Sequence, residues 1–149
     1  MDDSTIRSPA GFLQDLGMSR AQLQRFLARP RVAVLSWVAT QGRVDAAPMW
    51  FACRDGLFLL HTGHPSSKTK AILKNDRVAL TIQDVAPPYR YVTVRGQARL
   101  RQEPEEALRL YREQAYAYYG KVSGRFYLQR VLADFTGEHV IIEITPQIN

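Results

Sequence analysis

Apolar and polar residues alternate along much of this chain with the two-residue period of β-strands. In the segment 89–100, apolar or small residues occupy every second position, which predicts a strand with one buried face. Further strand patterns cover 31–38, 45–53, 57–62, 77–83 and 139–145. The run at 31–38 is almost continuously apolar, so we expect burial on both of its faces. Asp55-Gly56 separates two apolar runs and is a strong β-hairpin signal.

Helical spacing is confined to a few short segments. Ser19 and Gln22 match a capping box, and the apolar residues after them keep helical spacing until Pro30. A second helix begins after Ser66 or Ser67, a third covers 104–120, and a short helical piece lies around 126–132. Residues 1–18 show no period and are interpreted as a loosely ordered arm. Six short, mostly antiparallel strands with few helices predict one mainly β domain over 1–149, a six-stranded antiparallel barrel with flanking helices.

Composition narrows the class of partner. The 149 residues are 46% hydrophobic, which is typical of a globular domain, and 20 Lys and Arg against 14 acids give a net charge of +6. This excess favours nucleic acids, nucleotides or phosphorylated cofactors. Cys53 is the only cysteine and is interpreted as a small buried hydrophobe. No apolar run is long enough to cross a bilayer and the first residues lack signal-peptide features, so we expect a cytoplasmic protein without a membrane partner.

The segment 61–70 carries the strongest functional signal. An apolar strand runs directly into a segment with four hydroxyl residues and two lysines, Lys68 and Lys70, where a helix begins. The unpaired N–H groups and positive dipole end of a helix N-terminus suit a phosphate group. The alternative interpretation is an ordinary capped surface helix with solvated lysines.

Other constellations are weaker. His61-x-x-His64 has the spacing of a metal pair, but no cysteine or carboxylate nearby completes a ligand set, so we expect no metal. No nucleophile elbow, dinucleotide fingerprint or Walker motif occurs. The aromatic residues on predicted strands could stack on nucleic-acid bases, although core or interface packing is the commoner role. The tyrosines of the third helix are interpreted as helix-packing and dimer contacts: Tyr111, Tyr116, Tyr118 and Tyr119.

The order of several sequence blocks resembles the pyridoxamine 5'-phosphate oxidase-like split-barrel family. These blocks are the Asp-Gly hairpin, Thr62-x-x-x-Ser66-Ser67-Lys68, the run 75–80 and the run 92–98. The run 88–92 is similar to a branch of small members that use FMN or the deazaflavin cofactor F420. The resemblance extends over 19–146 and implies a six-stranded split barrel that forms a homodimer, with two cofactor sites across the interface.

The resemblance also implies roles for individual residues. Thr62, Ser66 and Lys68 match the positions that hold the cofactor phosphate, and Ser67 stands where the oxidases have arginine. The remaining cofactor-binding candidates are Pro48, Met49 and Trp50, whose backbone follows the flavin ring, with His61 and Tyr91, the latter near a position that reaches the cofactor from the second subunit. Tyr89 and Arg90 are the substrate-binding candidates. The substrate-binding C-terminal segment of the oxidases is absent, which argues against oxidation of pyridoxamine phosphate itself.

Three functions follow from these patterns. The leading hypothesis is a homodimeric oxidoreductase that binds FMN or F420 and passes a hydride to a small unsaturated or aromatic molecule, with no catalytic side chains because the cofactor carries the chemistry. FMN and F420 both present a phosphate and a flat tricyclic ring, so the sequence fits either. The second hypothesis is a flavin carrier that does not turn over. The third is a basic β-barrel that binds single-stranded nucleic acid, and here we expect only weak binding.

Overall fold

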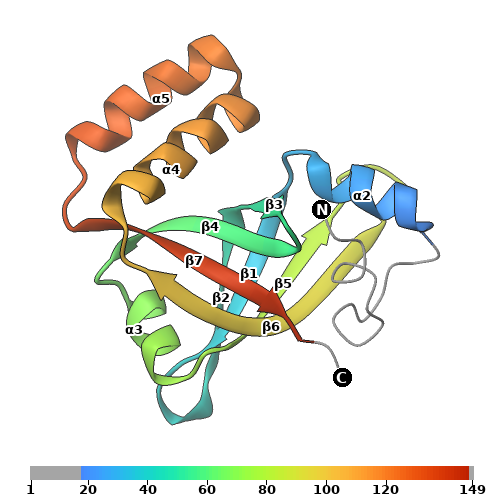
Figure 1. Cartoon of the computed structure of the whole chain (residues 1–149), viewed down its shortest axis with the longest axis horizontal. Helices are drawn as coiled ribbons and strands as arrows, with labels where there is room; N and C mark the ends of the chain where they lie inside the picture. The colour runs from blue at the N-terminus through green and yellow to red at the C-terminus, as the bar shows by residue number, and fades with distance from the viewer. Residues whose placement is uncertain (1–17, 148–149) are drawn as a thin grey trace.

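The strands form a single antiparallel sheet that curls into a half-open barrel (Figure 1). The computed structural model describes residues 18–147, so positions 1–17 of the predicted arm lie outside the described residues, while Met18 is buried in the core. The sheet has seven strands in the order β2-β1-β5-β6-β7-β4-β3. Their bounds are β1 Val32–Val38, β2 Val44–Trp50, β3 Ala52–Arg54, β4 Leu57–His64, β5 Arg77–Gln83, β6 Tyr91–Arg101 and β7 Glu138–Pro146. The predicted mainly β, antiparallel architecture is confirmed.

The additional strand comes from a break at Phe51 in the segment predicted as one strand, 45–53. β2 pairs with β1 at one edge of the sheet, whereas β3 pairs with β4 at the other edge. The chain therefore passes between the two edges through one residue. Phe51 is buried, and its N–H donates to the hydroxyl of Tyr118 at 3.1 Å instead of joining a strand ladder. The same hydroxyl donates to the carbonyl oxygen of Arg31 at 2.6 Å, so Tyr118 fastens a helix to this crossing point.

Within residues 18–147, four helices and a 3₁₀ turn lie around the sheet: α2 Arg20–Ala28, η1 Thr40–Gly42, α3 Ser67–Lys74, α4 Pro104–Tyr119 and α5 Lys121–Ala133. The capping box at the start of α2 is confirmed, since the Ser19 hydroxyl accepts from the Gln22 N–H at 3.2 Å. α5 is longer than the predicted piece at 126–132. α4 and α5 form a hairpin, and α4 packs on β4 and β7 (Figure 1). None of the described helices has the length and apolar character needed to span a bilayer.

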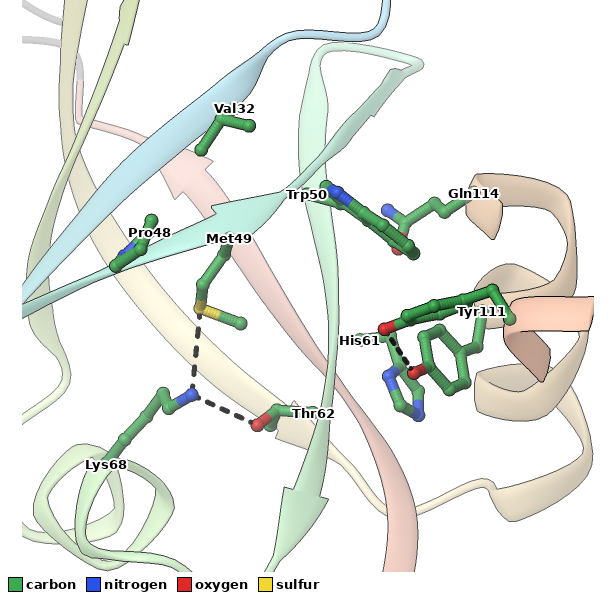
Figure 2. Close-up of a pocket in the computed structure, with 10 residues that line it drawn as sticks. Val32, Pro48, Met49, Trp50, His61, Thr62, Lys68, Tyr111 and Gln114 are labelled. Carbon is green, nitrogen blue, oxygen red and sulfur yellow. Dashed lines mark hydrogen bonds between the residues drawn. The ribbon is translucent and has the colours of Figure 1, made fainter. Parts of the chain in front are cut away.

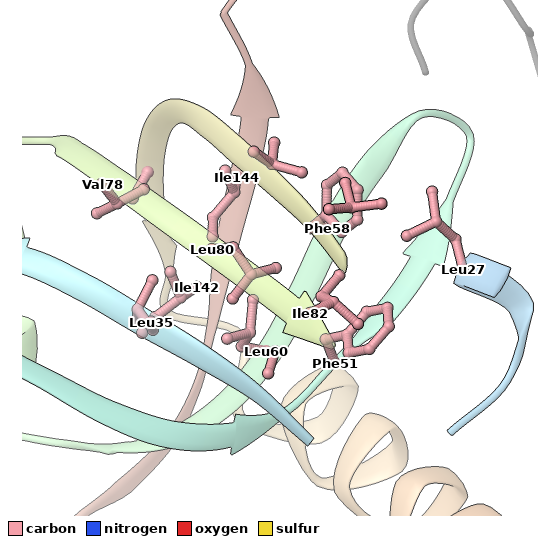
Figure 3. Packing of buried hydrophobic residues seen from close by; sticks show 14 of the residues in the cluster. Leu27, Leu35, Phe51, Phe58, Leu60, Val78, Leu80, Ile82, Ile142 and Ile144 are labelled. Carbon is pink, nitrogen blue, oxygen red and sulfur yellow. The ribbon is translucent and has the colours of Figure 1, made fainter. Parts of the chain in front are cut away.

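The core fills the inside of the curl with alternate side chains of the strands (Figure 3). The inward residues of β6 are the predicted ones, from Val92 and Val94 to Ala98. A smaller apolar cluster under α4 joins Leu59, Ala107, Leu110 and Ile141 on the outer side of β4 and β7. Cys53 is half-buried against the main core, as expected of a small hydrophobe, and burial raises the pKa of its thiol to about 12, which disfavours the thiolate.

The expected burial of β1 on both faces is wrong. Its outward side chains Val32 and Val34 are 54% and 40% exposed, because no described helix covers this side of the sheet. Across the neighbouring strands, Val34 lies opposite Thr81, which in turn lies opposite Thr93. The two threonine hydroxyls are 3.2 Å apart and hydrogen-bonded. The outward residues of β1 are therefore uncharged and are left uncovered in a single chain.

Candidate functional site

A cavity of about 390 Å³ opens at the split in the barrel, between β2 and β4 (Figure 2). α3 lies at one end of it, and the α4–α5 hairpin lies at the other (Figure 2). The lining residues come from six elements, β1, β2, β4, α3, α4 and α5, and are Val32, Pro48, Met49, Trp50, His61, Thr62, Lys68, Tyr111, Gln114 and Tyr127. The two ends differ in chemistry, one being cationic and the other aromatic.

Lys68 provides the charge at the α3 end. Its Nζ donates to the Thr62 hydroxyl at 3.2 Å and lies 3.8 Å from the sulfur of Met49 (Figure 2). Within residues 18–147, no carboxylate forms an ion pair with this ammonium. Burial lowers the pKa of Lys68, because desolvation disfavours its charged form. A half-buried ammonium beside a hydroxyl, with no described counter-charge, is suited to an anionic group such as a phosphate.

The start of α3 is held by a reciprocal cap that fixes where Lys68 emerges. The Ser66 hydroxyl accepts from the Thr69 N–H at 3.2 Å, and the Thr69 hydroxyl accepts from the Ser66 N–H at 2.9 Å. Thr69 is fully buried, and its hydroxyl is 2.8 Å from His64 Nδ1. Of the two predicted caps, Ser66 is therefore the N-cap residue. Its hydroxyl caps the helix start, so its contribution to the cavity is to position Lys68, two residues further on in the first turn.

Flat rings form the opposite end of the cavity. His61 on β4 stacks on Tyr111 of α4 with ring centroids 3.9 Å apart and an interplanar angle of 5°. The hydroxyls of Tyr111 and Tyr127 are 2.9 Å apart, which joins α4 to α5. Trp50 stacks on Tyr118 at 4.9 Å. Burial, followed by the contact with Tyr127, raises the pKa of Tyr111, so its hydroxyl stays protonated. This wall offers an apolar surface to a flat aromatic ligand.

His61 and His64 do not form the pair that their spacing suggested. His61 Nε2 lies 2.9 Å from Nδ1 of His139 on β7, whereas His64 contacts Thr69. Burial, then the nearby His139 and Lys68, lower the pKa of His61 to about 3, so the ring is neutral at physiological pH. Among the described residues, no three His, Cys, Asp or Glu side chains are placed to hold a metal ion.

The structure brings together part of the predicted site. The residues that share the cavity are Pro48, Met49, Trp50, His61, Thr62 and Lys68. Ser67 is exposed and lines a separate groove between α3 and η1, together with Lys70. Tyr89 and Arg90 lie on the loop between β5 and β6, and Tyr91 begins β6 opposite Gln83. These last three do not line the cavity of this chain, so their contact with a cofactor or substrate stays a prediction.

Sequence reasoning missed the contributions of α4 and α5. Tyr111 was assigned to helix packing and dimer contacts, yet it stacks on His61 inside the cavity. Gln114 lies on the buried face of α4, with its amide nitrogen 3.5 Å from the Leu59 carbonyl oxygen. The sequence did contain a sign of this role, because a glutamine among the apolar positions of a helix indicates a buried polar group that needs a partner. Tyr127 lies on α5, of which only a short part was predicted.

The chain is similar to one protein family and to several solved structures. The family model described as pyridoxamine 5'-phosphate oxidase matches residues 19–147. An F420 reductase structure is 25% identical, with a TM-score of 0.65 over 83% of this chain and 92% of that one. A conserved hypothetical protein of Mycobacterium tuberculosis is 24% identical, with a TM-score of 0.71 over 89% of this chain and 83% of that one. An FAD-binding protein of Mesorhizobium loti is 18% identical, with a TM-score of 0.60 over 87% and 91%. No curated protein matches the chain. The predicted split-barrel fold is confirmed.

Proposed function

Because the chain belongs to the pyridoxamine 5'-phosphate oxidase family, we propose that it is an oxidoreductase whose cavity binds FMN or F420. The observation that carries this proposal is the Lys68 ammonium. It is half-buried at one end of a cavity whose other end is aromatic, and no described carboxylate neutralises it. A molecule with a phosphate at one end and a flat ring at the other matches both ends.

The residues of the chain bind and orient this molecule. Lys68 and Thr62 hold the phosphate through charge-assisted and hydroxyl hydrogen bonds. β2 is an edge strand that pairs only with β1, so backbone groups on its free side around Met49 are available to the polar rim of the ring. Trp50 and Tyr111 exclude water from the ring. The bound cofactor would supply hydride transfer, and the protein binds the cofactor, orients it and excludes water from the cavity.

A second copy of the chain completes the proposed site. The uncovered valines of β1 provide an apolar surface, and Val32 belongs both to this surface and to the cavity lining. Association of two copies through this surface would cover the open side of the cavity. In such a homodimer, Tyr89, Arg90 and Tyr91 of the second copy are the groups we expect on the substrate side.

Cofactor titration tests the proposal directly. The purified protein is titrated with FMN and with F420 at fixed salt while the fluorescence of each is followed, and mass spectrometry identifies any cofactor that co-purifies. We expect saturable quenching by one of them. Absence of quenching by both would refute the proposal, and tight binding without reduction of any acceptor would indicate a flavin carrier.

The nucleic-acid alternative gives a different result in a parallel titration. Binding driven by the net charge of +6 falls steeply as salt increases, because it depends on counterion release. We expect weak binding to a labelled single strand that disappears near physiological salt. Tight, sequence-selective binding under those conditions would favour the nucleic-acid function.

A further inference from the structure

Two histidines are in hydrogen-bond contact beside the cavity, and the binding of a cofactor phosphate and ring does not use this contact. His61 lines the cavity, and its Nε2 is 2.9 Å from Nδ1 of His139. Building on the proposed function, we propose that His61 and His139 form a proton relay that delivers a solvent proton to the substrate during its reduction. His61 is the proton donor in the cavity, and His139 is the residue that resupplies it.

The connectivity of the ring nitrogens sets the direction of the relay. His61 Nε2 is occupied by the contact with His139, so Nδ1 is the nitrogen left to exchange a proton with a ligand. Within residues 18–147, no hydrogen bond engages this Nδ1 or the Nε2 of His139. His139 is only partly buried, so its Nε2 can exchange protons with water. Four nitrogens thus form a continuous path from solvent to the cavity.

Each of the two imidazole rings is held in place by an aromatic ring stacked on it. Tyr111 stacks on His61 at 3.9 Å, and Phe135 stacks on His139 at 3.9 Å with an interplanar angle of 9°. Gly63 lies directly opposite His139 in the β4–β7 ladder. A Cβ at Gly63 would come within 3.2 Å of the Phe135 ring, so glycine leaves the room that this ring needs. Clamped rings keep the nitrogen–nitrogen contact short, as proton transfer requires.

The proton balance of the reaction shows why such a donor is needed. Addition of a hydride to one atom of a C=C or C=O bond leaves the neighbouring atom with an electron pair that must take up one proton. The His61 Nδ1–H bond breaks as that bond to hydrogen forms. His61 Nε2 then takes the Nδ1 proton of His139, which recovers a proton from water at its Nε2. When the product leaves, cavity water protonates His61 Nδ1, the Nε2 proton of His61 returns to His139, and His139 releases one proton to solvent.

The charged and ionisable groups around the pair favour a neutral relay. Lys68 on α3, Tyr111 on α4 and Tyr127 on α5 surround His61, and no described carboxylate is hydrogen-bonded to either imidazole. Burial, His139 and Lys68 lower the pKa of His61 to about 3, and burial lowers the pKa of His139. A neutral His61 carries one N–H and one acceptor nitrogen, so it can pass a proton on without holding a charge.

Imidazole NMR tests the relay without any turnover. The chain has three histidines, so ¹⁵N-histidine labelling of the full-length, cofactor-saturated protein gives an assignable spectrum in which His64 is the internal reference. We expect His61 to stay neutral from pH 5 to pH 8, with its proton on Nδ1 and an accepting Nε2. A His61 proton on Nε2 at neutral pH would overturn the proposal, because no proton would then face the cavity.

Two substitutions of His139 separate a relay from a structural role. His139→Asn keeps an amide near the position of Nδ1, which can still hydrogen-bond His61 but cannot pass a proton on, whereas His139→Phe removes the bond. With 2-cyclohexen-1-one as the probe acceptor, we expect both variants to lower kcat by about 100-fold, with KM and cofactor affinity nearly unchanged. Wild-type kcat in His139→Asn would overturn the relay alone, since cofactor binding would still stand. Failure of the wild type to bind FMN or F420 would remove the proposed function and the relay together.

Discussion

Replacement of Lys68 by alanine is the most direct test of the cavity as a phosphate site. The substitution removes the one ammonium that lines the cavity within residues 18–147 and leaves the hydroxyl of Thr62 in place. A charge-assisted hydrogen bond contributes about 1.5–3 kcal/mol. Because each 1.4 kcal/mol corresponds to about tenfold in Kd, the expected loss of cofactor affinity is about 10- to 150-fold. The lower end of this range is favoured, since Thr62 can still donate to the phosphate.

Folding is expected to change little in the same variant. The described polar contacts of Lys68 are the Thr62 hydroxyl and the Met49 sulfur, and burial disfavours its charge. A positive charge in the first turn of a helix also opposes the helix dipole. We therefore expect the free energy of unfolding in urea to stay within about 0.5 kcal/mol of the wild type.

Lys74→Ala is the matched control, because Lys74 is an exposed lysine in the last turn of the same helix. Fluorescence titration with FMN and with F420 at fixed, low salt compares the three proteins. We expect wild-type affinity in Lys74→Ala and weakened affinity in Lys68→Ala. Equal affinity in Lys68→Ala and wild type would show that Lys68 is a solvated lysine on a capped helix, and the phosphate assignment would fail.

Three further predictions follow from other parts of the structure. The uncovered valines of β1 predict a twofold dimer, and light scattering that gave the monomer mass at micromolar protein would contradict it. Thr69→Val leaves the buried cap of α3 without its hydroxyl and is expected to lower the free energy of unfolding by about 1–3 kcal/mol, while Thr69→Ser, which keeps the hydroxyl, should cost clearly less in the same urea titration. Folding lowers the pKa of His61 from 6.5 to about 3, so between pH 3 and pH 6.5 the unfolded protein binds more protons at this residue than the folded protein does. The contribution of His61 to the free energy of unfolding should be fully present above pH 6.5 and be lost as the pH falls toward 3. In urea denaturation measured over this pH range, the free energy of unfolding of His61→Phe should therefore fall less steeply than that of the wild type.

Local patterns in the sequence predicted most of the framework. The alternation in β6, the capping box at Ser19 and the Asp55-Gly56 turn each depend on neighbouring residues, and all three are present, the turn with φ of 52° and 77°. The break at Phe51 could not be predicted in this way, because it is stabilised by Tyr118, 67 residues further along the chain. The His61–His139 contact joins residues 78 apart for the same reason. In the candidate site, the segment with Thr62 and Lys68 could be predicted because it is a local sequence pattern. The face of α4 that lines the cavity could not, because it depends on how α4 packs on β4 and β7.

The single-residue link at Phe51 also determines how the two edges of the sheet can move. β2 and β3 are joined there, and Tyr118 ties the link to α4, so the edges cannot separate at this end without breaking the pairing of β3 with β4. Away from Phe51, toward Val44 on β2 and His64 on β4, the two edges have no covalent connection. The split is thus closed covalently at Phe51 and not at its other end. Lys68 bridges these two edges, since its Nζ contacts Met49 on β2 and Thr62 on β4, so the proposed phosphate contact would join both edges of the split.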